Sequence, residues 1–434
     1  MIKWKFLLGA LAPLAALPVV VASCTNKSSK DTGSTKEESI ADIKKKLEDN
    51  IEKLSEQQKI ELINALDVTK TLNTDQKAEL IEKLNKGAGA VSSIVWYMNS
   101  AESRIAQIQA YRLATIAFDN LKKRAETDKM DYAALKQADG KVSNPADRKF
   151  VPVVFMDIDE TVFINEYTQA WTITDNNGQF SETKKDSIDA IGNRKPIPGA
   201  IEFIKHVFEA GGIVMFNSGI RQLRPSIDGI KKNLIAAGLD AKYVHDWMFW
   251  TSGVNPLKAD GTYQKAPWKE AIRDSAEAEG RDFWRATTKN QRMNAVSDNE
   301  AGWDFSQSQE GSGKAVKTRV IMRIGDDFND FYDDAYKSER STTKSKEFSK
   351  MEKVEKLFKD ENGSKGIKVV KDKVTKKVTI TDLDWYQFNV QVPGNSIYGG
   401  WNHGYGFGSY KKLWDALKEI KQNSQDQKQP QSTN

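Results

Sequence analysis

The chain has 434 residues, 39% of them hydrophobic, and a formal net charge of +5. This length suits an enzyme domain with an accessory segment, and the low hydrophobic fraction excludes a protein with many membrane-spanning helices. The charge is too small for a dedicated nucleic-acid binder, so no nucleic-acid polymer is expected as a partner. A single cysteine excludes an intrachain disulfide and a Cys-rich zinc site, and the presence of only three histidines argues against a His-based metal centre.

Residues 1–23 have the pattern of a bacterial signal peptide. Two lysines precede an apolar stretch from Phe6 to Val21, and small residues follow it. Cys24 comes directly after Val-Ala-Ser and completes a sequence that resembles a lipobox, although an ordinary signal peptide with a chance cysteine is the alternative. We expect cleavage before Cys24, a lipid on Cys24, and an extracytoplasmic protein that is anchored to the bacterial cell membrane as a lipoprotein.

Accessory segments are predicted on both sides of the enzyme domain. Residues 24–39 lack large apolar side chains and are predicted to be a flexible tether. Residues 40–88 place apolar side chains at helical spacing and contain an 18-residue internal repeat, in which Glu61-Leu-Ile63 matches Glu79-Leu-Ile81. We interpret them as a helical stalk, which acts as a spacer or as a partner-binding element. Residues 421–434 are rich in Gln and Ser and are predicted to be a disordered tail.

Segments of strand type and helix type alternate in the middle of the chain. The expected strands are Val151–Met156, Gly212–Phe216 and Val320–Ile324, and the expected helices are Val91–Lys123, Ala200–Glu209 and Arg224–Ala237, with Gly238 as a helix cap. Since continuous apolar strands separated by helices favour a parallel sheet with both faces covered, we predict an α/β domain over residues 91–420. Residues 247–313 form a long elaboration of this domain.

Acidic residues follow two of these strands directly. Asp157 and Asp159 come after the first strand, and Asp326 and Asp330 come after the third. In an open parallel sheet, ligands bind beyond the carboxyl ends of the strands. Neighbouring carboxylates repel one another unless a cation neutralises them or one of them stays protonated. The two acidic strand ends can therefore converge on a hard divalent ion, and an all-oxygen site suits Mg²⁺ together with a substrate phosphate.

Several motifs in this region resemble those of a known enzyme superfamily. Asp157-x-Asp-x-Thr161 is similar to motif I of the haloacid dehalogenase (HAD) superfamily, and Gly325-Asp-Asp-x-x-Asp330 is similar to its motif IV. The strings that resemble bacterial class C acid phosphatases, the lipoprotein e(P4) family, are Asp157–Asn165, Pro198–Phe203, Gly325–Phe331 and Tyr398–Trp401. The resemblance implies an HAD-like Rossmannoid fold, with helices around a parallel sheet. It also implies a Mg²⁺-dependent acid phosphatase or 5′-nucleotidase that acts on a small phosphomonoester.

The resemblance further implies roles for the acidic residues. Asp157 would attack phosphorus and form an aspartyl-phosphate, which divides one displacement into two easier ones. Asp159, kept protonated, would donate a proton to the leaving group and would then activate the hydrolytic water. Mg²⁺ would be held by Asp157, the backbone carbonyl of Asp159 and Asp326, with Asp330 assisting through water.

The family pattern also implies two phosphate-binding positions. A lysine in a Lys-x-x-Arg setting would neutralise a phosphate oxygen; Lys289 fits this pattern, and Lys314 is the runner-up. The second strand should end in Ser or Thr, but here it is followed by Asn217 and Ser218. Either side chain can donate a hydrogen bond to a phosphate oxygen, so this departure from motif II leaves both residues as candidates.

Aromatic residues are the candidates for substrate binding. Tyr398 and Trp401 match the family's Tyr-Gly-Gly-Trp segment, and Tyr167 and Trp171 lie shortly after motif I. In the family, aromatic residues stack on the base of nucleoside monophosphates, which are therefore expected among the substrates. Plain packing is the alternative for each of these side chains.

A second class of function stays open at this stage. The chain is alternatively a catalytically impaired HAD-like surface lipoprotein that serves as a binding or adhesion module. The altered motif II and the stalk favour this reading. The intact pair of Asp157 and Asp159 argues against it, because a pure binding module has no need for an acid next to a nucleophile.

Overall fold

The computed structural model describes most of the chain from residue 73 onward and two short stretches before it. The described residues are 54–55, 58–59, 73–125, 127, 130–132, 149–253, 284–303, 305, 315–336, 341–395 and 408–426. The predictions that fall outside them concern the signal peptide, Cys24, the tether, most of the stalk, much of the 247–313 elaboration, Lys314, Tyr398 and Trp401. Among the helices of the described part, none is both long enough and apolar enough to cross a membrane.

The chain divides into two compact units, each of which is described by itself. The terminal unit comprises Met1–Val91, Trp171–Gln179 and Tyr405–Asn434. The core unit comprises Ser92–Ala170 and Phe180–Gly404, and it contains every strand of the sheet described below.

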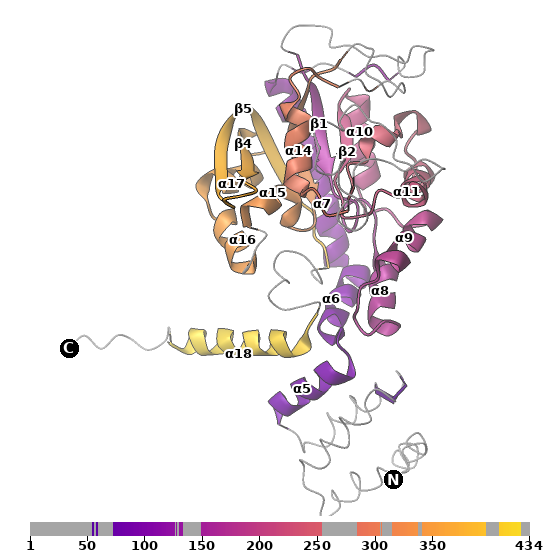
Figure 1. The fold of residues 1–434 in the computed structure, drawn as a ribbon, viewed down its shortest axis with the longest axis vertical. Helices are drawn as coiled ribbons and strands as arrows, with labels where there is room; N and C mark the ends of the chain where they lie inside the picture. Colours follow the sequence, from indigo (N-terminus) through magenta and orange to yellow (C-terminus); the bar gives the residue numbers. More distant parts are fainter. Residues whose placement is uncertain are drawn as a thin grey trace, which may run out of the picture. The chain divides into compact units, whose positions relative to one another are not determined.

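A five-stranded sheet lies at the centre of the core unit, with the strand order β2-β1-β3-β5-β4 (Figure 1). β1 (Val151–Met156) pairs in parallel with β2 (Ile213–Phe216) on one side and with β3 (Thr318–Gly325) on the other. β3 also pairs in parallel with β5 (Val378–Gln391), and β4 (Ser364–Lys371) joins β5 in antiparallel orientation at the edge.

The register of the parallel strands brings their carboxyl ends to one edge of the sheet. Met156 pairs with Phe216 of β2 and with Ile324 of β3, and Gly325 pairs with Gln391 of β5. β1 is buried along its whole length, as expected for a central parallel strand with both faces covered. The segments that follow these strands are therefore close in space although they are far apart in sequence.

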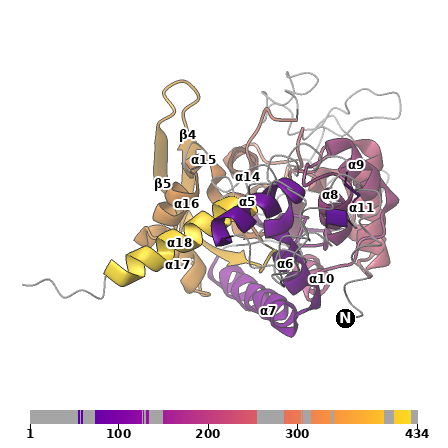
Figure 2. The same cartoon turned by 90° about the horizontal axis from the view of Figure 1, so that it is seen from below.

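Helices cover both faces of the sheet. α7 (Ala101–Arg124) packs on β3 and β5 and against α10 (Ala200–Glu209). α14 (Lys289–Asp298) packs on β3 and against α15 (Asn329–Tyr336), on the other side of the sheet from α7 (Figure 2). Two further helices, α6 (Ala88–Asn99) and α8 (Glu166–Thr174), have residues in both units. The remaining helices and 3₁₀ turns of the core unit are α9 (Glu182–Ile191), α11 (Arg224–Ala236), η3 (Ala241–Tyr243), η4 (Asp246–Met248), α16 (Ser341–Ser349) and α17 (Glu352–Lys359).

The predicted α/β fold is confirmed, and several elements lie where the sequence places them. β1 and α10 begin and end at the predicted residues, and α11 ends just before Gly238, which has the left-handed conformation expected of a helix cap. The predicted helical region 91–123 is divided into α6 and α7. The division falls at Ser100, because its side chain accepts a 3.1 Å hydrogen bond from the Ser103 backbone N–H and so caps the start of α7.

The β4–β5 hairpin is the part of the sheet that the sequence does not predict. β4 carries lysines, and both strands include exposed side chains, without the continuous apolar run that marks β1. Ile367 and Val369 nevertheless pack into a second hydrophobic cluster with Phe331 of α15 and Leu357 of α17. Residues 387–390 of β5, beside β3, are buried on both faces, whereas much of the rest of the hairpin is exposed, as is usual for an antiparallel edge.

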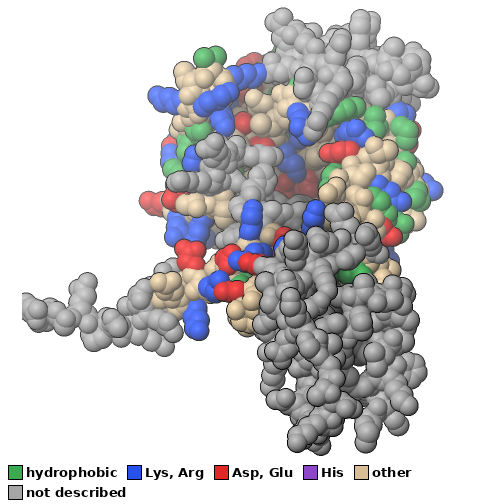
Figure 3. Space-filling model, turned by 60° about the horizontal axis from the view of Figure 1, so that its bottom comes forward, with side chains coloured by type: hydrophobic (Ala, Val, Ile, Leu, Met, Phe, Trp, Pro, Cys, Tyr) green, Lys and Arg blue, Asp and Glu red, His purple; other side chains and the backbone are tan. Residues whose placement is uncertain are grey.

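The described part of the terminal unit pairs two helices from distant parts of the chain. α5 (Thr74–Leu84) contacts α18 (Tyr410–Asp426). Trp414 Nε1 donates a 2.8 Å hydrogen bond to Asp75 Oδ1, and Lys418 Nζ lies 3.1 Å from the same oxygen. Figure 3 shows acidic and basic side chains interspersed along the segment that leads to the C-terminal tail.

Two predicted boundaries at the C-terminal end need correction. The sequence analysis assigns residues up to 420 to the α/β domain, but α18 belongs to the terminal unit, with the last helix of the predicted stalk. α18 also includes residues 421–426 of the predicted tail. A polar sequence can continue a helix when charges pair one turn apart, as Lys411 and Asp415 do at 2.6 Å. Residues 427–434 lie outside the described residues.

Candidate active site

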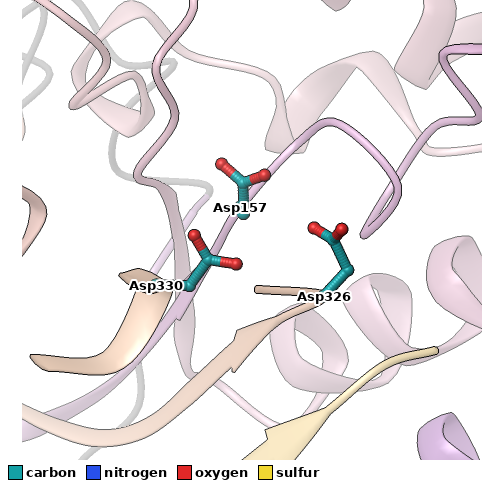
Figure 4. A group of neighbouring side chains, drawn as sticks. All are labelled: Asp157, Asp326 and Asp330. Carbon is teal, nitrogen blue, oxygen red and sulfur yellow. The ribbon is translucent and has the colours of Figure 1, made fainter. Parts of the chain in front are cut away.

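Three carboxylates from two strand ends meet at the carboxyl edge of the sheet (Figure 4). Asp157 follows β1, Asp326 follows β3, and Asp330 lies in the first turn of α15. Each offers a carboxylate oxygen that lies within 4.8 Å of those of the other two. We call these residues the acidic cluster. The structure thus brings together acidic residues that the sequence analysis places at two different strands.

Two glycines leave room for these carboxylates to pack closely. A Cβ atom at Gly325 would collide with Oδ2 of Asp330, and a Cβ atom at Gly394 would collide with Oδ2 of Asp326. Thr161 of motif I also contacts the cluster, because its Oγ1 donates a 3.3 Å hydrogen bond to Asp326 Oδ1. Steric exclusion therefore explains why a glycine, Gly325, precedes the acidic residues of motif IV.

Lys289 provides a basic group for the acidic cluster. Its Nζ lies 2.7 Å from Asp157 Oδ1 and 2.6 Å from Asp330 Oδ1, and its side chain is 17% exposed. Lys289 is the first residue of α14, and the preceding Thr288 accepts a 3.1 Å hydrogen bond from the Gln291 backbone N–H. The start of this helix therefore places the predicted lysine against carboxylates from two other elements.

Burial is the main cause of the raised pKa values in the acidic cluster. Burial raises the pKa of Asp157 to about 6, while Lys289 opposes the shift and the charge of Asp330 adds to it. Burial also raises the pKa of Asp330 to about 6, again against Lys289. The pKa of Asp326 lies well above its ordinary value, first because of burial and then because of repulsion from Asp330. Ionised together, the three carboxylates would exceed the single ammonium by two negative charges.

A divalent cation fits this arrangement on two grounds. Its charge would cancel the excess negative charge, which is costly at a buried site. The donors are carboxylate oxygens, which are the ligands that hard cations such as Mg²⁺ and Ca²⁺ prefer. Asp157, Asp326 and Asp330 can each supply one oxygen to such an ion.

A second buried ionic group surrounds Asp159. Arg194 Nη2 donates to Asp159 Oδ1 at 2.5 Å, and Lys185 Nζ lies 3.2 Å from the same oxygen. Both cations also contact Asp189, Lys185 at 2.6 Å and Arg194 at 3.1 Å. Two carboxylates thus face two cations, and we call these residues the salt-bridge cluster.

The ionisation of Asp159 differs from the prediction. Burial by itself raises the pKa of Asp159, but Lys185 and Arg194 outweigh burial and hold the pKa below its ordinary value. Asp159 is therefore ionised in this structure, whereas the sequence analysis expects it to be protonated. Because these cations hold its carboxylate, Asp159 would contact a metal ion through its backbone carbonyl.

The two motif II candidates have different hydrogen-bond partners. Asn217 takes the first position after β2, where its Nδ2 donates to the Lys289 carbonyl at 3.0 Å and its Oδ1 accepts from Arg292 Nε at 2.7 Å. Both ends of this amide are thus engaged with α14. Ser218 Oγ accepts a 3.4 Å hydrogen bond from the Ile220 N–H, which leaves the hydroxyl hydrogen to donate to a ligand. Asn217 therefore holds the segment that carries Lys289, and each of the two side chains keeps one hydrogen to donate, on Asn217 Nδ2 and on Ser218 Oγ.

A comparison with protein families assigns this site to a known group of enzymes. Residues 77–365, more than half of the chain, match the model of the HAD superfamily, subfamily IIIB (acid phosphatase). The chain belongs to this family. The subfamily IIIB chain is therefore a phosphoric monoester hydrolase, and its small phosphomonoester substrate and HAD-like fold follow from the same match.

Solved structures that are similar to this subfamily IIIB chain include two of the class C acid phosphatase from Bacillus anthracis. The structure with tungstate bound has 15% sequence identity, covers 75% of this chain and 95% of that chain, and has a TM-score of 0.44. The second has 16% identity, covers 76% of this chain and 95% of that chain, and has a TM-score of 0.40. A search of curated proteins found no match.

The aromatic substrate candidates of the subfamily IIIB chain occupy different environments. Tyr167 of α8 is 59% exposed, and Lys184 Nζ lies 5.8 Å from the centre of its ring. Trp171 is on the same helix but falls in the terminal unit. Tyr398 and Trp401 lie outside the described residues. Tyr167 is thus a solvent-facing ring rather than a core residue.

Sequence analysis missed the cations of the salt-bridge cluster. Lys185 and Arg194 lie in a polar stretch that reads as a solvated surface, and they are buried because they pair with Asp159. One local signal was available, since Lys185 and Asp189 are one turn apart on α9. Nothing in the local sequence indicates the contact of Arg194.

Proposed function

We propose that the chain is a Mg²⁺-dependent phosphomonoesterase, an acid phosphatase or 5′-nucleotidase, that acts through an aspartyl-phosphate on Asp157. The observation that carries this proposal is the 2.7 Å contact between Asp157 and Lys289 inside the acidic cluster. A carboxylate that attacks a phosphate is repelled by its negative charge, and a fixed cation beside the nucleophile reduces that repulsion. The family membership of the chain supports the same chemistry.

Asp157 would begin the reaction at the carboxyl edge of the sheet. One carboxylate oxygen of Asp157 forms a bond to phosphorus, while the bond between phosphorus and the leaving oxygen breaks. Lys289 and the hydroxyl of Ser218 would bind non-bridging oxygens, which hold the negative charge of the transferring group. These contacts orient the phosphate in line with the leaving group.

Asp159 would transfer the protons in both steps. Since Lys185 and Arg194 keep Asp159 ionised, the proton for the leaving oxygen would arrive with the substrate. Below a pH of about 6, a phosphomonoester itself carries one acidic proton, which Asp159 can relay. In the second step, ionised Asp159 takes a proton from the water that attacks the aspartyl-phosphate, and the bond between phosphorus and the Asp157 oxygen breaks. Asp159 then returns this proton to the departing phosphate, so both aspartates end the cycle ionised. This assignment predicts activity on the acid side of neutrality.

Asp157, Asp326 and Asp330 would hold Mg²⁺, together with the backbone carbonyl of Asp159. When bound, the ion would neutralise the excess charge of the acidic cluster and reduce the repulsion between the Asp157 carboxylate and the phosphate. The carboxylate composition of the cluster and its buried, uncompensated charge support this choice of ion.

Nucleoside monophosphates are the proposed substrates, and the cell membrane is the proposed location. The base of the nucleotide would stack on Tyr398 and Trp401, and a lipid on Cys24 would anchor the chain outside the cytoplasm. The signal-peptide pattern and the lipobox support the anchor. Phosphate release from a panel of nucleotides and sugar phosphates tests the substrate. Palmitate labelling of the wild type and of Cys24→Ser in a bacterial host tests the anchor, and equal labelling of the two would reject it.

The activity itself is tested with p-nitrophenyl phosphate at a pH of about 5–6. We expect phosphate release with Mg²⁺, loss of release with EDTA, and no release by a folded Asp157→Asn variant. Retained activity of Asp157→Asn would reject the assigned nucleophile. A folded wild-type protein without metal-dependent release would instead favour the binding or adhesion module.

A further inference from the structure

We propose that Asp333 is a positioning residue that fixes Lys289 at the acidic cluster. Asp333 lies in α15, shortly beyond Asp330, and is 2% exposed. Both of its carboxylate oxygens bind the backbone of α14. Oδ2 accepts from the Lys289 N–H at 3.1 Å, and Oδ1 accepts from the Asn290 N–H at 2.9 Å. The inference rests on the proposed function, because it concerns the lysine that would bind phosphate there.

The electrostatics of a helix start explain why Lys289 needs this partner. The first N–H groups of a helix have no partner within the helix, and this end carries a partial positive charge. A lysine at the first position adds a second positive charge, whereas the Asp333 carboxylate opposes both. Thr288 binds the N–H of Gln291, so Asp333 satisfies the two N–H groups that precede it.

The backbone of Lys289 is held from two sides. Asp333 accepts from its N–H, and Asn217 donates to its carbonyl at 3.0 Å. The side chain then reaches Asp157 and Asp330. Asp330 and Asp333 lie on either side of the non-helical residue Tyr332 within α15, so this one kinked segment supplies both a partner for the ammonium and an anchor for the backbone behind it. The position of Lys289 Nζ relative to Asp157 is therefore set by α15.

Asp334 offers a control that is matched in helix, charge and burial. It follows Asp333 directly and is 5% exposed. Its Oδ2 accepts a 3.2 Å hydrogen bond from the side chain of Asn290, and its carboxylate also hydrogen-bonds the side chain of Thr288, but neither contact is with the backbone of Lys289. Asp334→Asn keeps an acceptor oxygen for the contact with Asn290 and should leave Lys289 in place.

The test is a double-mutant cycle on hydrolysis of p-nitrophenyl phosphate by the full chain. Asp333→Asn turns one acceptor oxygen into an amide group that faces a backbone N–H. We expect kcat/KM to fall roughly ten- to a hundredfold, while Asp334→Asn changes it less than about threefold. In a Lys289→Met background, Asp333→Asn should lower kcat/KM by less than about twofold, because the lysine that Asp333 positions is absent. Circular dichroism and thermal melting verify that each variant is folded.

Two results would overturn the role of Asp333. One is an unchanged kcat/KM in folded Asp333→Asn, and the other is the same loss in the Lys289→Met background as in the wild type. If Asp333→Asn does not fold, Asp333→Ser, which keeps a hydroxyl acceptor, is judged by the same two criteria. An inactive wild type counts against the proposed function, whereas either overturning result in an active enzyme counts against Asp333 alone.

Discussion

The two buried ionic clusters at the edge of the sheet differ in their charge balance. In the acidic cluster, three carboxylates face the single ammonium of Lys289. In the salt-bridge cluster, two carboxylates face Lys185 and Arg194. Both lie largely out of water, where an uncompensated charge is costly. From this difference we infer that the acidic cluster receives a cation and a phosphate, whereas the salt-bridge cluster holds Asp159 in one place.

The largest expected effect is on activity and concerns the acidic cluster. Asp157→Asn removes the proposed nucleophile, and we expect kcat to fall at least about a thousandfold, because an amide cannot form the acyl-phosphate. Single-turnover measurements with p-nitrophenyl phosphate provide the sensitivity. A loss of less than about tenfold would move the chemistry away from this cluster.

The next effect is on stability and concerns the salt-bridge cluster. Arg194→Met leaves Asp159 and Asp189 with one cation, which gives this cluster an excess negative charge as well. We expect the free energy of unfolding to fall by about 3 kcal/mol in urea titrations, because a buried pair loses one partner. Lys368→Met, which breaks a more exposed ion pair with Asp298, should cost less than about 1 kcal/mol. Equal costs for the two variants would remove the distinction between a buried and a surface pair.

In the acidic cluster, by contrast, we expect a substitution to raise the stability of the metal-free protein. Asp326→Asn removes one of three mutually repelling carboxylates, so the metal-free protein should gain roughly 1 kcal/mol of stability while its activity falls. Urea unfolding in EDTA measures the gain. A destabilised metal-free variant would show that Asp326 is compensated without a cation, and the contrast between the clusters would then be wrong.

The smallest effect is a dependence of stability on pH in the absence of metal. Burial raises the pKa of Asp157 and Asp330 from 3.8 to about 6 in the folded chain, so between these values the folded state binds more protons than the unfolded state. Metal-free protein should therefore gain stability as the pH falls from 7 toward 5, and lose it as the pH rises again. Thermal melts in EDTA at several pH values measure the trend, and saturating Mg²⁺ should flatten it.

The parts of the molecule that could be predicted from sequence are those with local signals. β1 is an unbroken apolar run that ends in Asp157, and α10 is a clearly amphipathic helix, so each was placed to the residue. Lys289 was found through a family pattern and not through any local property. Its contact with Asp157 depends on how α14 is oriented, which no short segment specifies.

The parts that could not be predicted depend on partners that are distant in sequence. Arg194, Lys185 and Asp333 are polar residues in polar surroundings, which ordinarily indicates exposure. They are buried because Asp159 and the backbone of α14 satisfy their hydrogen bonds. The β4–β5 hairpin is not predicted for a related reason, since much of it is exposed and the lysines of β4 interrupt its apolar positions.

Calorimetric titration of the metal-free protein with Mg²⁺ is the most direct test of the central claim, that the acidic cluster collects a divalent cation beside Asp157. We predict one ion per chain for the wild type, and binding that is at least about tenfold weaker for folded Asp326→Asn. A folded wild type that binds no Mg²⁺, or an Asp326→Asn variant that binds it equally well, would contradict the account.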